Sequence, residues 1–198
     1  MPGDGGPAVL HPAADGLPVV ITVDTSLLVA SIDASDQHHS IAWSVYRSLV
    51  ESGTVVAICQ PLLMLEFWSA MRKTSNRLEA ADVDQLVTEA RSRLSGQLAL
   101  FHDQVPRDLA GKRAFLVRAG EELLVRWLAP LRIVRVRLTN ALLDAARELL
   151  IEYGLDSHDA LVTAVAQKTS ATAGVAPAIA TLDHGFERVN DLHLWGRR

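Results

Sequence analysis

The sequence predicts an α/β fold in which a parallel sheet is covered by helices on both faces. Short β-branched runs alternate with longer amphipathic segments, 49% of the residues are hydrophobic, and only 5% are aromatic. Short apolar runs are typical of strands buried on both faces, and strand–helix alternation is typical of parallel sheets. At 198 residues the chain suits one domain, or one domain with an insertion.

The expected strands and helices can be placed by their apolar patterns. Buried strands are predicted at 19–23, 54–59 and 178–182, a short strand near 133–136, and a last edge strand at 192–195. Helices are predicted at 36–52, from Pro61 to about 73, as two or three segments within 78–130, from Thr139 to 152, and from 156 or 157 to about 170. Thr139 is expected to cap its helix, Gly154 to end it, and Asp156 or Ser157 to cap the next one.

The ends of the chain and its single cysteine suggest where the protein works. Residues 1–18 are rich in Gly, Pro and Ala, and we expect a flexible tail there. Residues 19–198 are expected to form one domain, with a helical insertion at about 78–130. Cys59 can form no internal disulfide, and neither a signal peptide nor a membrane span is evident. The expected location is therefore the cytoplasm.

Charge is distributed unevenly along the chain. Residues 71–137 carry 13 Lys and Arg against 8 Asp and Glu, whereas the rest carries 6 basic and 15 acidic residues. The simpler interpretation is ordinary solvated charge on helices. The alternative is a basic lobe that meets phosphate groups.

Four carboxylates stand where the predicted fold would bring them together. Asp24 and Asp183 each follow a buried strand, Glu66 lies in an apolar helical run, and Asp159 begins a helix. Ligands of open α/β sheets bind at the carboxyl ends of the strands. Such a cluster is costly unless a proton or a cation neutralises it, and oxygen ligands suit Mg²⁺ or Mn²⁺.

Each acid also has an ordinary structural explanation. Asp24 and Asp183 could be turn residues, and Asp159 could stabilise a helix N-terminus through the helix dipole. Glu66 could pair with Arg72 or Lys73, or it could lie on an exposed face. Glu66 is the least expected of the four on structural grounds, because unpaired ionisable groups rarely occupy apolar helices.

In this order the four segments resemble the PIN-domain family. The matching stretches are VVITVDTSLLVA (19–30), QPLLMLEFWSAMRK (60–73), YGLDSHDALVTAVA (153–166) and IATLDHGF (179–186). The resemblance implies a three-layer α/β/α sandwich with a central parallel sheet. The stretch between Glu66 and Asp159 is longer than in compact members of the family, and residues 1–18 are additional.

The resemblance also implies functional roles. It assigns catalysis and metal binding, with Mg²⁺ or Mn²⁺, to Asp24, Glu66, Asp159 and Asp183, and supporting hydrogen bonds to Ser26 and Thr181. The chain would be a metal-dependent endoribonuclease, similar to the VapC-type toxins of toxin–antitoxin pairs. RNA would be its substrate, a small antitoxin its inhibitor, and a homodimer its assembly.

Further polar and aromatic residues have a structural role as the simpler explanation. We expect His158 and His184 to be exposed neighbours of the ligands rather than catalytic groups, and Asp156 to be an N-cap rather than part of the site. Arg72 and Lys73 suit a helix C-terminus, with contact to RNA phosphate as the alternative. Packing is the expected role of Trp43 and Trp68, with base stacking as the alternative, and Cys59 is expected to be buried.

Two rival functions remain at this point. The chain could be a PIN-fold module that binds RNA or protein without cleaving it; the presence of all four acids argues against this. It could also be a phosphotransfer enzyme with Asp24 as nucleophile. Haloacid-dehalogenase-type enzymes, however, typically need an aspartate two residues later, where this chain has Ser26.

Overall fold

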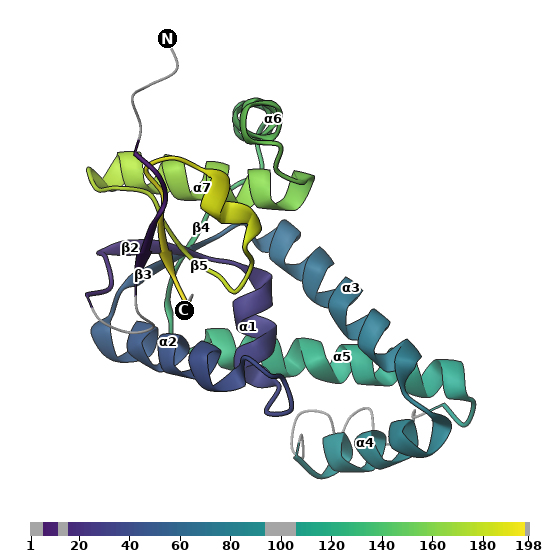
Figure 1. The fold of residues 1–198 in the computed structure, drawn as a ribbon. Helices are drawn as coiled ribbons and strands as arrows, with labels where there is room; N and C mark the ends of the chain where they lie inside the picture. Colours follow the sequence, from purple (N-terminus) through teal and green to yellow (C-terminus); the bar gives the residue numbers. More distant parts are fainter. Residues whose placement is uncertain (1–5, 12–15, 94–105, 197–198) are drawn as a thin grey trace. The chain divides into compact units, whose positions relative to one another are not determined.

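The computed structural model describes residues 6–11, 16–93 and 106–196. Seven helices, six strands and a short 3₁₀ segment lie within these ranges (Figure 1). The strands are β1 (Val9–His11), β2 (Val20–Val23), β3 (Val55–Ile58), β4 (Arg132–Arg135), β5 (Ala178–Ala180) and β6 (His193–Trp195). The helices are α1 (Thr25–Ile32), α2 (His39–Ser52), α3 (Gln60–Arg77), α4 (Ala80–Arg93), α5 (Leu109–Leu128), α6 (Asn140–Tyr153), α7 (Ser157–Ala173) and the 3₁₀ segment η2 (Gly185–Arg188).

The chain divides into two compact units. The first consists of Met1–Leu63 and Pro130–Arg198, and the second is Met64–Ala129. The first unit contains the whole sheet, and the second contains α4, α5 and most of α3. None of the helices that the structure describes combines the length and apolarity of a membrane-spanning segment.

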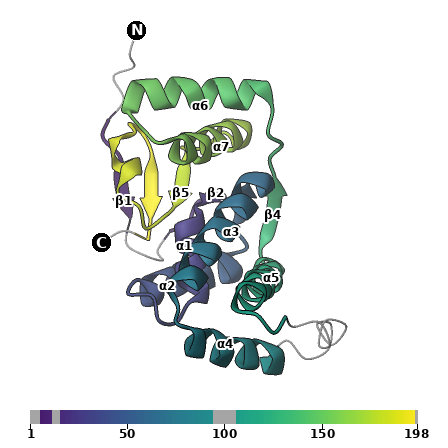
Figure 2. The ribbon, with the colours of Figure 1, turned by 90° about the vertical axis from the view of Figure 1, so that its right-hand side faces the viewer.

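The first unit is a three-layer α/β/α sandwich. Its six strands are all parallel, in the order β1-β6-β5-β2-β3-β4. Helices α6 and α7 cover one face of the sheet, with α6 lying outside α7 (Figures 1 and 2). Helices α1 and α2 lie on the opposite face. The predicted fold class is therefore confirmed.

The position of a ligand site follows from this strand order. From β2 the chain proceeds to β3 and β4 on one side, whereas β5 and β6 lie on the other side. The order of the strands thus changes direction between β2 and β5. In open α/β sheets this switch point, at the carboxyl ends of the strands, is where ligands bind.

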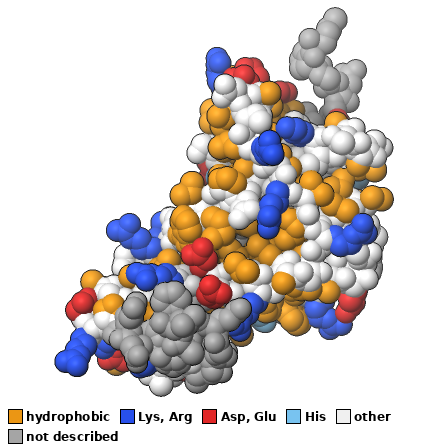
Figure 3. Space-filling model, turned by 180° about the vertical axis from the view of Figure 1, so that it is seen from behind, with side chains coloured by type: hydrophobic (Ala, Val, Ile, Leu, Met, Phe, Trp, Pro, Cys, Tyr) orange, Lys and Arg blue, Asp and Glu red, His pale blue; other side chains and the backbone are white. Residues whose placement is uncertain are grey.

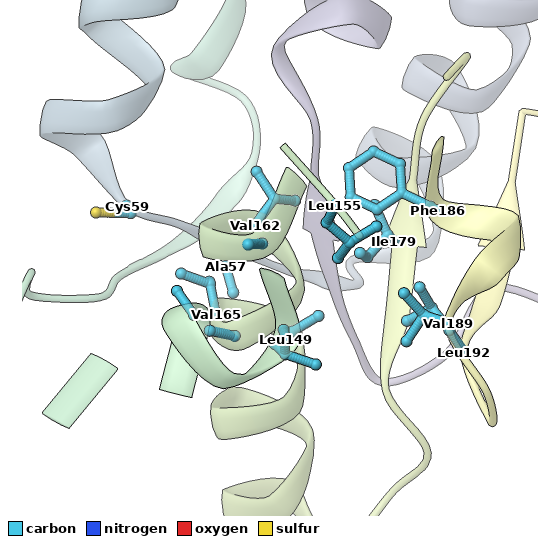
Figure 4. Close-up of a cluster of buried hydrophobic side chains, with 14 of the residues drawn as sticks. Ala57, Cys59, Leu149, Leu155, Val162, Val165, Ile179, Phe186, Val189 and Leu192 are labelled. Atoms are coloured by element: carbon cyan, nitrogen blue, oxygen red, sulfur yellow. The ribbon is translucent and has the colours of Figure 1, made fainter. Parts of the chain in front are cut away.

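The main core lies between the sheet and α7. Strand side chains of Ala57 and Ile179 meet Val162 and Val165 of α7, and Phe186 of η2 is fully buried beside them (Figure 4). Two caps fix the helices of this layer. Thr139 accepts a hydrogen bond from the Leu142 N–H at 3.3 Å, and Gly154 ends α6 with φ of 63°. Both residues were predicted in these roles.

The second unit has a small core of its own. It consists of Val83 and Val87 of α4 with Phe115, Leu116 and Ala119 of α5. The Asp108 side chain caps α5 by accepting from the Gly111 N–H at 2.7 Å. The predicted helical region at 78–130 therefore contains α4 and α5, while residues 94–105 of that region lie outside the described ranges.

Three elements differ from the prediction. Val9–His11, within the predicted tail, form strand β1, which pairs with β6. Strand β6 is consequently not at the edge of the sheet, because β1 occupies that place. Helix α1 was not predicted, since Thr25–Ile32 was considered only as the turn after a strand. Residues 1–5 and 12–15 of the predicted tail lie outside the described residues.

Candidate metal centre

Asp24 ends β2 and begins α1, and its carboxylate is almost completely buried. The backbone at Asp24 is extended (φ −78°, ψ 149°), and 3% of the residue is exposed. Oδ2 accepts hydrogen bonds from the hydroxyls of Ser26 and Thr181, the latter at 2.9 Å. Oδ1 lies 3.0 Å from Nε2 of His158. Both oxygens of the Asp24 carboxylate therefore accept hydrogen bonds from side chains.

These contacts keep Asp24 ionised despite its burial. Burial alone raises the pKa of a carboxyl group, because a charge is poorly solvated in the protein interior. Hydrogen bonds from His158, Ser26 and Thr181, and the charge of His158 when protonated, outweigh that effect, so the pKa of Asp24 lies below its ordinary value. A negative charge is thus fixed at the end of β2.

Asp159 lies in the first turn of α7, and its pKa is shifted in the opposite direction from that of Asp24. The Asp156 side chain caps α7 by accepting from the His158 and Asp159 N–H groups, each at 2.8 Å. Burial, followed by the charges of Asp156, Asp183 and Asp24, raises the pKa of Asp159 to about 7. Asp159 is 7% exposed. The negative charge around Asp159 is therefore incompletely compensated by the protein.

Asp183 follows β5 and approaches the same region. Its backbone N–H donates to Oγ1 of Thr181 at 2.9 Å, and its Oδ1 accepts from the Gly185 N–H at 2.7 Å. A Cβ atom built on Gly185 would overlap Oδ2 of Asp159 and lie 3.4 Å from Oδ1 of Asp183. The two carboxylates therefore flank one point, which Gly185 leaves open by having no side chain.

The fourth predicted ligand belongs to a different unit. Glu66 is half-buried on the second turn of α3, within Met64–Ala129. Asp24, Asp159 and Asp183 are brought together inside the first unit, whereas the role of Glu66 remains a prediction. Arg72 and Lys73 lie farther along α3 and are exposed.

His158 differs from its prediction as an exposed neighbour. It is half-buried, and Nε2 of its imidazole donates to the ionised Asp24 carboxylate. Asp24 and His158 can both offer a ligand atom to a metal ion. His158 was not predicted as part of the site, because its neighbour Asp159 was the residue of this segment expected to bind the metal. His184, in contrast, is exposed as expected and contacts Glu187 at 3.0 Å.

The remaining candidate residues lie outside this cluster of carboxylates. Trp43 is 38% exposed and stacks on Tyr46, with ring centroids 5.5 Å apart. Trp68 is 39% exposed and donates to Oε2 of Glu121 at 3.3 Å. Cys59 is buried, with a free thiol. Lys and Arg side chains on the face drawn in Figure 3 are separated by apolar and uncharged surface rather than joined in one patch.

The donor set fits a hard divalent cation. Carboxylate oxygens are the preferred ligands of Mg²⁺ and Mn²⁺. Asp24 supplies a fixed negative charge, and the pKa of Asp159 is raised partly because its carboxylate neighbours repel a further negative charge. A cation at this place would remove that repulsion, so the residues present suit the metal that the sequence predicts.

Comparison with known families supports the same interpretation. Residues 112–192 match the family model of the PIN domain. The matched segment includes Asp159 and Asp183 and begins after Asp24 and Glu66. PIN domains are generally nucleases, so the match indicates a nuclease-type function. No curated protein matches the chain.

Proposed function

We propose that this chain is a metal-dependent endoribonuclease that hydrolyses RNA phosphodiester bonds. The observation that carries the proposal is the convergence of Asp24, Asp159 and Asp183 at the switch point of a parallel sheet. The raised pKa of Asp159 supports it, because shifted titration is common where charged groups are gathered for function. The similarity of residues 112–192 to PIN domains gives the reaction class.

The proposed ligands of Mg²⁺ or Mn²⁺ are Asp24, Glu66, Asp159 and Asp183. Glu66 is included because residues 60–73 resemble a segment of the PIN-domain family, and because a carboxylate is unexpected within an apolar helical run.

The protein's own residues would prepare the site for RNA. A bound divalent cation supplies charge stabilisation for phosphodiester hydrolysis and a water of lowered pKa. Ser26 and Thr181 hold the Asp24 carboxylate, and Gly185 leaves room between Asp159 and Asp183. Arg72 and Lys73 are exposed and suited to contact RNA phosphates. We expect a product that carries a 5′ phosphate and binding that weakens as salt increases.

Cleavage of end-labelled RNA by the purified chain tests the proposal. Hydrolysis should require Mg²⁺ or Mn²⁺ and stop in EDTA. Asp24→Asn and Asp159→Asn should each lower the rate by at least about 100-fold, since even changes behind the ligands typically cost about 10–100-fold. Asp144→Asn alters an exposed aspartate of α6 and is the matched control. Wild-type rates in the two site variants would refute the assignment.

The biological role is part of the same proposal. We propose that the chain is the toxin of a toxin–antitoxin pair, acts as a homodimer, and is inhibited by a small antitoxin protein. Brief expression of the wild type should arrest growth and produce new RNA 5′ ends, whereas Asp24→Asn should do neither. Metal-dependent cleavage without growth arrest would contradict the toxin role alone. Absence of any cleavage, with RNA binding retained, would favour a non-catalytic binding module.

A further inference from the structure

A small cavity lies directly beside the Asp24–His158 contact. Its walls come from β2, the starts of α1 and α3, β3 and α7, all within the first unit. It has about 10 Å³ of room for the centre of a water molecule. A single bound water needs roughly 10–15 Å³ by the same measure. The cavity therefore has room for about one water molecule.

Polar groups are present in an otherwise apolar lining. Thr22, Thr25, Cys59 and His158 line the cavity together with Val and Leu side chains. Apolar cavities of proteins stay dry, but a buried water is stable where it finds two to four polar partners. Val162 and Val165, which close the cavity on the α7 side, belong to the main core (Figure 4).

Thr22 provides the group that requires such a partner. It is 2% exposed, in the middle of the central strand β2, and it lines the cavity. Its Oγ1 is buried and has no hydrogen-bond partner within the part of the chain that the structure describes. A buried hydroxyl without a partner costs about 1–3 kcal/mol. A threonine at this position is therefore unfavourable unless the cavity holds a hydrogen-bonding molecule.

The imidazole of His158 lines the same cavity. Its Nε2 lies 3.0 Å from Oδ1 of Asp24, and an ionised carboxylate only accepts hydrogen bonds. Nε2 must therefore carry the proton of this contact. In the neutral ring, Nδ1 is then an acceptor, and Nδ1 is buried. A water that donates to Nδ1 would favour this tautomer and this ring position.

We propose that the cavity binds one water molecule, which bridges Oγ1 of Thr22 and the imidazole of His158. Thr22 is then a positioning residue: it acts on Asp24 only through the water and the histidine. The site would hold the Nε2–H of His158 towards Asp24. Neither the water nor the orientation of the ring depends on the proposed nuclease activity.

Nuclear magnetic resonance on the metal-free protein tests the water directly. The wild type should show a cross-peak between a long-lived water and the γ-methyl group of Thr22. Nitrogen shifts of the His158 ring should report the Nε2–H tautomer. Thr22→Ser keeps the hydroxyl and should keep the Nε2–H tautomer and a long-lived water, seen here through cross-peaks to the β-protons of the serine. Thr22→Val should lose the water and shift the His158 ring towards a mixture of tautomers.

Two outcomes would overturn the proposal. One is the absence of a long-lived water near Thr22 in the wild type, a measurement that needs no variant to fold. The other is an unchanged His158 ring in a folded Thr22→Val protein. Mn²⁺ affinity should fall by about 10-fold in Thr22→Val and stay within about 2-fold in Thr22→Ser. Only the expectation for Mn²⁺ affinity rests on the proposed function. A protein that binds the water but cleaves no RNA would contradict the proposed nuclease activity and leave the proposal of the water site standing.

Discussion

Nε2 of His158 lies 3.0 Å from Oδ1 of Asp24, although 134 positions separate the two residues in the chain. This contact joins the end of β2 to the first turn of α7. It also gives a buried carboxylate a hydrogen-bond donor from the same unit. Its loss should therefore be measurable even without substrate.

Replacement of His158 by Phe should destabilise the metal-free protein. The Phe side chain fills similar space but leaves Asp24 with one hydrogen-bond donor fewer, which costs about 1–3 kcal/mol for a buried polar group. Urea unfolding in EDTA would measure the change in the free energy of unfolding. His184→Phe, at an exposed position, should change that free energy by less than about 0.5 kcal/mol. Equal effects of both replacements would contradict the importance of the contact.

Asp159 should make the stability of the metal-free protein fall as pH rises. Its folded-state pKa is about 7 and its ordinary value is 3.8. Below about pH 4 both the folded and the unfolded chain hold the proton. Between about pH 4 and about pH 7 only the folded chain keeps it, so the free energy of unfolding decreases, and above that range the loss is complete.

Asp159→Asn should remove this part of the pH dependence. Unfolding curves in EDTA at several pH values would compare the variant with the wild type and with Asp144→Asn. Saturating Mg²⁺ should flatten the wild-type profile, because a bound cation offsets the repulsion among the carboxylates. Asp24 contributes in the opposite direction: its lowered pKa gives stability that is lost only as pH falls below about 3.8. A wild-type slope retained in Asp159→Asn would show that another group causes it.

The carboxylates of the site could be predicted because the ends of buried strands can be recognised in the sequence. Asp24 and Asp183 follow apolar runs, and parallel strands share one carboxyl edge. The state of Asp159 could not be predicted in this way, because its pKa depends on burial and on three neighbouring carboxylates. The same holds for His158, whose position beside Asp24 depends on its rotamer and not only on its place in the chain.

Two short elements, β1 and α1, could not be predicted from the sequence either. β1 has three residues, and the apolar run that marks it in the sequence is only Ala8, Val9 and Leu10, too short to predict a strand. Its pairing with β6 is a long-range interaction that local pattern does not encode. The unpredicted α1 has an apolar sequence without strong amphipathic alternation, since five of its eight residues are buried. Such a segment resembles a strand continuation as much as a helix.

Asp156→Asn should lower the pKa of Asp159 while the N-cap of α7 is kept. Asn is as good an N-cap as Asp, so the hydrogen bonds to the His158 and Asp159 N–H groups can be kept. The negative charge of Asp156 is one cause of the raised pKa of Asp159 and would be lost. Titration of the Asp159 carboxyl by nuclear magnetic resonance measures the shift. An unchanged pKa in a folded variant would exclude Asp156 as a cause.

Gly185→Ala should disturb Asp159 by direct overlap. A Cβ atom at this position would collide with Oδ2 of Asp159, so the carboxylate or η2 must move. We expect a loss of about 1–3 kcal/mol of stability and weaker Mn²⁺ binding. The double variant with Asp159→Ala should recover most of the stability, because the colliding group is gone. Additive losses in the double variant would place the cause elsewhere.

A pair of proline replacements should establish whether β1 is a genuine part of the sheet. The Val9 N–H donates to the Leu192 carbonyl at 2.8 Å, so Val9→Pro removes a ladder hydrogen bond and places the ring against β6. Alternation along a strand turns the Leu10 N–H towards the open edge of the sheet, where proline is tolerated. Val9→Pro should therefore cost about 1–3 kcal/mol of stability, and Leu10→Pro less than about 0.5 kcal/mol. Urea unfolding measures both, and two variants as stable as the wild type would mean that β1 adds nothing to the stability of the sheet.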